Sequence, residues 1–263
     1  MQEVLALALQ SMQQDMQRLD RIGSNLANAV TPGYQREVMG SRPLGMVGST
    51  FASMVGNAPS APVAAEVSSG RISAPALLIQ MDTRPGSLKA TGQGLDVALA
   101  GPGLFEVVTD GGPAYTRQGN FRLDGRGRLV TAQGFPVMGK GGEIYLNGDR
   151  PFIDAGGNVY ESESKSAGAN AQPIAQLKVV HAEDAARLQH KGDGLLSADG
   201  AFNVLKDSDI QIRQGFLENS NVNSMQEMVQ LVQTMRHFES LQKVALGYDD
   251  MMGQAIRKLG ELS

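Results

Sequence analysis

Apolar residues recur at alternating steps of four and three along residues 1–30 of the chain. This spacing predicts an amphipathic helix whose apolar positions form a heptad seam. The flanking positions hold glutamine and charged side chains, so the apolar stripe is narrow and suits another helix better than a broad globular core. The residues of this predicted seam are Leu5, Leu9, Met12, Met16, Leu19 and Leu26.

Within the C-terminal segment, residues 216–263, the same alternation runs from Met228 to Leu262 and predicts a second, longer helix. The tetrapeptide SMQE, at 224–227, has the form of a capping box, in which the serine and glutamate side chains each satisfy a free backbone donor. A helix from Ser224 to Leu262 would measure roughly 58 Å, and a helix of that length needs a partner along it. The residues of this second predicted seam are Met228, Val232, Met235, Phe238, Leu241, Tyr248, Met252 and Leu259.

Between the two ends, the pattern changes to short apolar runs separated by turn residues. From 95 to 212 glycine recurs every few residues, and the Asp-Gly pairs at 110–111 and 124–125 predict hairpins. This pattern is typical of an all-β domain, which we place at residues 81–215. Residues 31–80 have no period and are rich in Gly, Ser, Ala and Pro, so they are predicted to form an extended linker.

The predicted fold class is therefore α+β. Long N- and C-terminal helices form a coiled coil, and a central, Gly-rich, hairpin-based β domain lies between them in the sequence. Two narrow seams at opposite ends of one chain can bury each other, but a pair of helices leaves the outer flanks of both half exposed. Further burial would come from other copies or related chains, and repeated head-to-tail contacts of this kind build filaments or tubes.

Composition removes several classes of function. The chain carries 23 basic and 27 acidic residues without a basic block, which argues against nucleic-acid binding. It has no cysteine, so disulfides, thiolate metal sites and cysteine nucleophiles are excluded. No window is apolar enough to span a bilayer, so no membrane insertion is expected. No basic residue precedes Arg18, so the sequence predicts either a cytoplasmic protein or one exported without a cleavable signal.

No residue is predicted to carry out chemistry. Asp96 lies between apolar residues and is expected to bond backbone donors in a β turn. The histidines, His181, His190 and His237, are too far apart to form a short metal-ligand motif, and no G-x-S-x-G elbow occurs. We therefore expect no catalytic residue, no cofactor, no metal and no small-molecule substrate.

Four long motifs follow one another from near one terminus to near the other. They read SNLANAVTPGYQRE (24–37), GSLKATGQGLDVALAGPGLFEV (86–107), AYTRQGNFRLDGRGRLVTAQGFPVMG (114–139) and GFLENSNVNSMQEMVQLVQTMRHFE (215–239). In this order they resemble the signatures of the bacterial flagellar rod and hook proteins. The motif residues are Asn25, Leu26, Asn28, Pro32, Gly33, Leu95, Asp96, Gly101, Gly103, Phe105, Tyr115, Thr116, Arg117, Gly119, Phe121, Leu217, Glu218, Ser220, Asn221 and Val222.

The resemblance implies a structural subunit of the basal-body rod that polymerises and transmits motor torque across the periplasm. In that family the terminal helices form an inner coiled-coil tube with the β domain outside it. The implied partners are other copies of the chain, other rod subunits and the flagellar type III export apparatus. Within the family the chain looks most like the proximal rod subunit, and the distal rod subunit is the alternative. The hook subunit is usually much longer.

The resemblance also suggests why the first helix ends where it does. Thr31, Pro32 and Gly33 are expected to stop the helix and direct the chain from a tube wall toward the β layer. Asn25 and Asn28 are expected to hydrogen-bond nearby backbone or a neighbouring helix.

Alternatives of other classes make different predictions. A hydrolase built on the β domain would need a deep pocket within 95–212 that gathers titratable groups with shifted pKa values. A free periplasmic binding module would be a stable monomer with both ends folded without partners. The periodicity by itself also fits two ordinary amphipathic helices packed on a globular core.

Overall fold

The computed structural model describes residues 2–41, 77–148, 151–161, 172–182, 188–198 and 202–260. The chain divides into two compact units. One unit comprises residues 1–38 and 80–263 and contains both helices and nearly all described strands. The other comprises residues 39–79, and the structure describes only 39–41 and 77–79 of it. Most of the predicted linker at 31–80 therefore lies outside the described residues.

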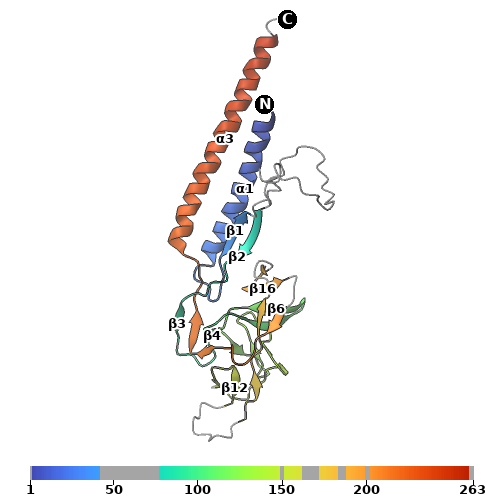
Figure 1. Cartoon of the computed structure of the whole chain (residues 1–263), viewed down its shortest axis with the longest axis vertical. Coiled ribbons are helices and arrows are strands. Elements are labelled where there is room, and N and C mark those ends of the chain that lie inside the picture. Colours follow the sequence, from blue (N-terminus) through green and yellow to red (C-terminus); the bar gives the residue numbers. More distant parts are fainter. Residues whose placement is uncertain are drawn as a thin grey trace, which may run out of the picture. The chain divides into compact units, whose positions relative to one another are not determined.

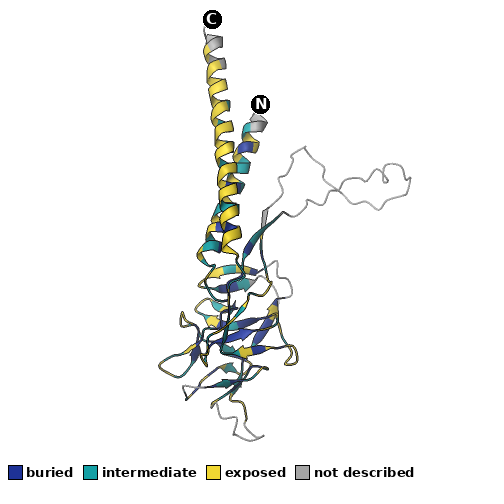
Figure 2. Ribbon diagram, turned by 90° about the vertical axis from the view of Figure 1, so that its left-hand side faces the viewer, coloured by how far each residue is buried: buried dark blue, intermediate teal, exposed yellow. Residues whose placement is uncertain are grey.

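Two helices lie side by side in the larger unit (Figures 1 and 2). Helix α1 runs from Gln2 to Ala27, and helix α3 runs from Ser224 to Gly260. The strands lie between them in the sequence, so the α+β class is confirmed. Among the described residues, no helix combines the length and apolar composition needed to cross a membrane.

The face of α1 that is buried against α3 differs in part from the predicted seam. Ala8, Asp15 and Ile22, which are seven residues apart, are buried. Four residues of the predicted seam, which are also spaced seven apart, are half-buried. The side chains of Leu9 and Met16 are 50% and 56% exposed. The prediction placed Leu9 and Met16 on the seam because it counted apolar side chains only, and Asp15 can be buried because His237 supplies a partner (Nδ1–Oδ2, 2.5 Å). The half-buried residues are Leu5, Met12, Leu19 and Leu26.

The buried face of α3 alternates strictly by four and three. Glu227 and Thr234 are buried, and the half-buried residues of this face are Leu231, Phe238, Leu241, Ala245 and Tyr248. Three of these, Phe238, Leu241 and Tyr248, belong to the predicted seam. The other predicted residues with described side chains, Met228, Val232, Met235 and Met252, are exposed, and the side chain of Leu259 lies outside the described residues.

Helix α3 begins at the predicted residue, but the predicted cap is wrong. The side-chain oxygen of Asn223 accepts a hydrogen bond from the backbone N–H of Gln226 (3.2 Å), and the backbone carbonyl of Asn223 accepts one from the N–H of Glu227 (3.0 Å). Asparagine caps a helix as well as serine does, so Asn223 replaces Ser224 in this role. The Glu227 side chain is thereby free to bind Arg36 (2.6 Å) instead of a backbone donor.

The described strands pair antiparallel wherever their register is defined. Six of them form one sheet in the order β15-β16-β6-β5-β14-β17, and the others form pairs or a three-stranded sheet, β11-β12-β13. The pairs are β1-β2, β10-β9, β18-β4, β19-β3 and β7-β8. The strand bounds are β1 Glu37–Ser41, β2 Leu77–Met81, β3 Leu88–Ala90, β4 Val97–Leu99, β5 Leu104–Thr109, β6 Gly112–Thr116, β7 Arg122–Leu123, β8 Leu129–Val130, β9 Met138–Gly139, β10 Gly142–Glu143, β11 Phe152–Ile153, β12 Asn158–Tyr160, β13 Ala175–Gln176, β14 Val179–Ala182, β15 Leu188–Gly192, β16 Leu195–Ala198, β17 Phe202–Val204, β18 Ile212–Gln214 and β19 Phe216–Glu218.

The main apolar core lies among these strands. Phe105 and Phe121, both from the sequence motifs, meet edge to face with their ring centroids 5.2 Å apart. A second cluster contains Met81 and Leu104, and Tyr115 packs on it while stacking on Phe202. The aromatic motif residues therefore hold the β strands together.

Two short hairpins share one design. In the turn between β7 and β8, the Asp124 side chain accepts the backbone N–H groups of Arg126 (2.8 Å) and Arg128 (2.9 Å). In the turn between β11 and β12, Asp154 accepts those of Gly156 (2.9 Å) and Asn158 (2.8 Å). In both turns the aspartate side chain replaces backbone partners and fixes the register of two very short strands.

This design makes the first hairpin sensitive to acid. A hydrogen bond from the Arg128 side chain, aided by backbone N–H groups, lowers the pKa of Asp124 to about 2 from the usual 3.8. The charged carboxylate therefore stabilises the turn above pH ~4, and that contribution is lost as the pH falls toward 2. A carboxyl titration by NMR should place the Asp124 midpoint near pH 2. A midpoint near 3.8 would contradict the hydrogen-bonding pattern.

Candidate functional site

Residues from all four sequence motifs meet where the two helices approach the strands. The segments that meet are the turn after α1, the stretch 82–87, and the stretch 218–223 that leads into α3 (Figure 1). We call this meeting point the junction. Its members are Asn25, Gly33, Tyr34, Arg36, Glu37, Gly86, Arg117, Glu218, Asn221 and Glu227.

Asn25 is the hub on the helical side, and its side chain is almost fully enclosed, with 1% exposed. Its amide nitrogen donates to the backbone carbonyl of Glu37 (2.9 Å) and to the Glu227 carboxylate (3.4 Å). Its amide oxygen accepts the backbone N–H of Glu37 (2.9 Å) and the Tyr34 hydroxyl (3.3 Å). One side chain near the end of α1 thus binds the start of β1 and the first turn of α3.

Tyr34 is buried beside Asn25. Burial raises the pKa of the Tyr34 hydroxyl, and the nearby Glu37 carboxylate raises it further, so the hydroxyl stays protonated and able to donate. Its ring stacks on His190 of β15 with centroids 4.7 Å apart, and the His190 ring is 3.0 Å from the carbonyl of Gln35. These contacts attach the turn after α1 to the six-stranded sheet.

Ion pairs connect the same turn to both helices. The Arg36 Nε donates to Glu227 on α3 (2.6 Å), and Arg21 on α1 donates to Glu37 (2.8 Å). Glu227 and Glu37 are buried, whereas the two arginines are partly exposed. Each buried carboxylate therefore has a cationic partner that offsets its loss of hydration.

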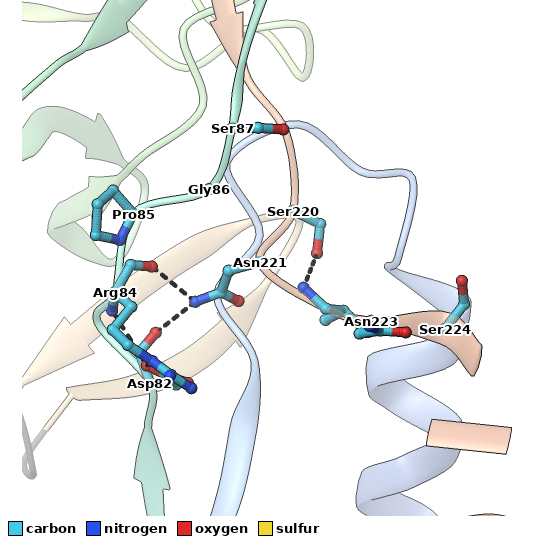
Figure 3. A pocket seen from close by; sticks show the side chains of 10 residues that line it. Asp82, Arg84, Pro85, Gly86, Ser87, Ser220, Asn221, Asn223 and Ser224 are labelled. Carbon is cyan, nitrogen blue, oxygen red and sulfur yellow. Dashed lines mark hydrogen bonds and ion pairs between the residues drawn. The ribbon is translucent and has the colours of Figure 1, made fainter. Parts of the chain in front are cut away.

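Asn221 fixes the stretch before α3. Its side-chain oxygen accepts the backbone N–H of Arg36 (2.7 Å), and its side-chain nitrogen donates to the carbonyls of Asp82 (2.8 Å) and Arg84 (2.8 Å). Figure 3 shows the last two bonds. Three separate stretches of chain are therefore held by one amide.

Arg117 and Glu218 form the hub on the strand side. Their side chains are each 3% exposed, and Arg117 Nε lies 2.5 Å from Glu218 Oε2. The remaining guanidinium donors reach the carbonyls of Gly103 (2.6 Å) and Gly101 (2.8 Å). Both charges are fully enclosed, yet the guanidinium and the carboxylate are each well supplied with partners.

Glu218 also binds the backbone of two motif glycines. Its other carboxylate oxygen accepts the N–H of Gly86 (2.8 Å), and its backbone carbonyl accepts the N–H of Gly33 (2.8 Å). Gly33 has a φ of 67°, and a Cβ there would lie 2.5 Å from the Arg117 backbone. The chain that leaves α1 passes too close to Arg117 for any side chain.

The structure brings some motif residues together and leaves others elsewhere. The motif residues that meet at the junction are Asn25, Gly33, Arg117, Glu218 and Asn221, and the carbonyls of Gly101 and Gly103 bind Arg117 there. The other motif residues fall into two groups. Those on or beside the strands are Leu95, Asp96, Phe105, Tyr115, Thr116, Gly119 and Phe121. Those that flank the junction are Leu26, Asn28, Pro32, Leu217, Ser220 and Val222.

Asn28 bonds within its own turn: its side chain donates to the carbonyl of Ser24 (2.9 Å) and accepts the Thr31 hydroxyl (3.2 Å). Reasoning from the sequence did not single out Arg36, Glu37 or Gly86, and it gave Glu227 only a capping role. Their partners lie far away along the chain, and local periodicity carries no signal for such pairs.

An open recess borders the junction (Figure 3). Asp82 and Arg84 on its wall bind each other, and the hydrogen bond from Arg84 lowers the pKa of Asp82. The described residues that line the recess include no histidine that could activate a serine hydroxyl. Nowhere in the described ranges do three potential metal ligands come together.

The network predicts unequal roles for the two motif asparagines. Replacing Asn25 with alanine would leave the backbone N–H and C=O of Glu37 without partners and should lower the free energy of unfolding by about 1–3 kcal/mol. Asn28→Ala, which removes local and partly exposed bonds, is the matched control and should cost less. Urea denaturation of both variants measures the difference, and equal losses would contradict the role of Asn25 as a hub.

Comparison with known proteins gives consistent matches. Residues 98–161 match the profile of the flagellar hook protein FlgE/F/G D1 domain, and residues 213–258 match that of the flagellar basal body rod FlgEFG protein C-terminal. The chain is 32% identical over 265 residues to the flagellar basal-body rod protein FlgF of Rhizobium meliloti (strain 1021), which covers 99% of both chains. It is 32% identical over 240 residues to FlgF of Salmonella typhimurium, covering 88% of each. It is 29% identical over 259 residues to the rod protein FlgG of Bacillus subtilis (strain 168), covering 91% of this chain and 92% of that one.

Proposed function

The chain belongs to the family of flagellar basal-body rod proteins and is of the FlgF type, and from this premise we propose that it polymerises through its terminal helices to transmit motor torque. Membership of this family makes it a structural protein of the flagellar basal body that assembles with other rod subunits, and not an enzyme. The proposal concerns how the subunit makes those contacts and carries load.

One observation supports polymerisation through the helices. After α1 and α3 have packed on each other, apolar side chains remain exposed on both. Leu9 and Met16 on α1 are about half exposed, and so are Met228, Val232 and Met235 on α3. Burying such residues against neighbouring subunits removes apolar surface from water, which favours association. The exposed members of the two predicted seams thus become the contacts between subunits, within a coiled-coil arrangement of several chains.

The junction supplies the connection through which load passes. A torque applied to the β strands must reach the helices through the segments that meet there. Asn25, Arg117 and Asn221 tie these segments by side-chain bonds within a largely buried network. Such a network resists local opening, because each bond that opens leaves a buried polar group without its partner.

Other features of the proposal follow from the same premise. The subunit reaches the periplasmic part of the rod through the flagellar type III export apparatus, without a cleavable signal. Its neighbours are further copies of itself and other rod subunits. It binds no nucleic acid, small-molecule substrate or cofactor, and it does not insert into a membrane. The FlgF relatives, which match over nearly the full chain, favour the proximal over the distal rod position.

Charge placed on the exposed α1 face tests the proposal. The double variant Leu9→Glu with Met16→Glu should fold normally, because both side chains lie off the intrachain seam, but cells that carry it should lack rods and not swim. The matched control is Gln10→Glu with Gln17→Glu, which has the same spacing one position further around the helix and should leave motility intact. Swimming of the first variant would contradict assembly through this face.

A further inference from the structure

The first three turns of α3 carry an exposed apolar face that is rich in methionine. Met225, Met228 and Met235 are 77%, 54% and 47% exposed, and Val229 and Val232 beside them are also exposed. These positions follow i, i+3, i+4, i+7 and i+10, so the side chains lie on one face of the helix. We call these five residues the methionine face.

The methionine face is separate from the contacts that fold the chain. Helix α3 packs on α1 through a different set, which includes Glu227, Leu231 and Thr234. A helix advances 100° per residue, so the centres of the two faces are more than a third of a turn apart. A chemical change on the methionine face therefore alters what neighbouring molecules meet and leaves the buried contacts of Glu227, Leu231 and Thr234 in place.

Methionine thioethers are the only sulfur groups of this chain, which has 13 methionines and no cysteine. We propose that Met225, Met228 and Met235 form an oxidation site at which a peroxide converts the face to sulfoxides and blocks the contact of α3 with a neighbouring subunit. The inference rests on the proposed function. It applies to the subunit before assembly, when these side chains are accessible.

The reaction balances without a cofactor. The thioether sulfur attacks one oxygen of hydrogen peroxide, an S–O bond forms, the O–O bond breaks, and the other oxygen leaves as water. The sulfur loses two electrons, which the peroxide gains. The product is polar, so burying it in an apolar contact without a donor weakens association by roughly tenfold for each sulfoxide.

The full-length chain can be tested in the cells that use it, with glutamine as a polar substitute for the sulfoxide. The triple variant Met225→Gln, Met228→Gln and Met235→Gln should keep the helix content of the wild-type chain by circular dichroism but yield at least roughly tenfold fewer assembled rods. The matched triple variant to leucine should assemble normally. A single Met251→Gln variant, also exposed but on another face, should assemble normally too.

Peroxide treatment of the purified chain supplies the chemical readout. Peptide mass spectrometry should find sulfoxide at the three face methionines before Met81, which is buried in a core cluster. Treated wild-type chain, returned to assembling cells or rods, should be incorporated poorly. The leucine variant in which Met16 and Met252, also exposed, are replaced by leucine as well should be incorporated after treatment like its untreated form.

The outcomes separate the two proposals. Normal rods from the glutamine variant, or failure of the leucine variant, would overturn the oxidation site while leaving the rod function standing. Motile cells in a strain that lacks the chain altogether would overturn the proposed function and the inference that rests on it.

Discussion

Replacing Arg117 with methionine should destabilise the chain by about 3–5 kcal/mol, because the Glu218 carboxylate would stay buried without its cationic partner. The same change removes the donors that bind the carbonyls of Gly101 and Gly103. The loss should appear as a lower midpoint in urea denaturation followed by circular dichroism and intrinsic tyrosine fluorescence. In cells, the variant should be poorly incorporated into rods because the strand side of the junction is no longer fixed.

The ion pair between Arg84 and Asp82 offers the matched control. Arg84 is 80% exposed, so Arg84→Met should leave the denaturation midpoint unchanged within error. An Arg117→Met protein with the denaturation midpoint of the wild type would show that the buried pair does not hold the junction together.

Gly33→Ala should be the most damaging small substitution in the chain's first motif. An alanine there must adopt a left-handed φ and place its Cβ 2.5–2.7 Å from backbone atoms of Arg117 and Gln118. The backbone conformation costs about 1–2 kcal/mol and the overpacking about 1–3 kcal/mol, so we expect a total loss of about 2–5 kcal/mol. The hydrogen bond from Gly33 to the Glu218 carbonyl should lengthen or break, which amide exchange at residue 33 would report.

Gly23→Ala provides the opposite expectation in the same segment. Gly23 lies inside α1, and a Cβ there would meet nothing within 4 Å. Alanine favours the helix by about 1 kcal/mol relative to glycine, so this variant should be slightly more stable than the wild type. If Gly33→Ala were as stable as Gly23→Ala, the structure would be wrong in placing residue 33 so close to the Arg117 backbone.

The sequence pattern predicted the helices better than it predicted their contacts. The helix predicted over residues 1–30 spans Gln2–Ala27, and the second begins at Ser224 as predicted. Apolar periodicity reports helix formation and the general direction of a buried stripe. Periodicity could not predict the burial of Asp15, because that burial depends on a hydrogen-bond partner, His237, which lies on the other helix.

Sequence reasoning identified several residues of the junction but not the contacts between them. Asn25, Gly33, Arg117, Glu218 and Asn221 all belong to the motifs, but nothing local says that they meet. Asn25 and Glu227 are 202 residues apart, and Arg117 and Glu218 are 101 apart. Periodicity and turn signals describe neighbours along the chain, so pairs at these separations emerge only once the fold is known.

The most direct test of the account is density at subunit resolution for basal bodies purified from cells that make this chain. The account predicts that the chain lies in the rod, with Leu9 and Met16 on α1 and the methionine face on α3 covered by helices of neighbouring subunits. Density that placed the chain outside the rod, or left these side chains facing solvent within it, would contradict the claim that the terminal helices are completed by assembly.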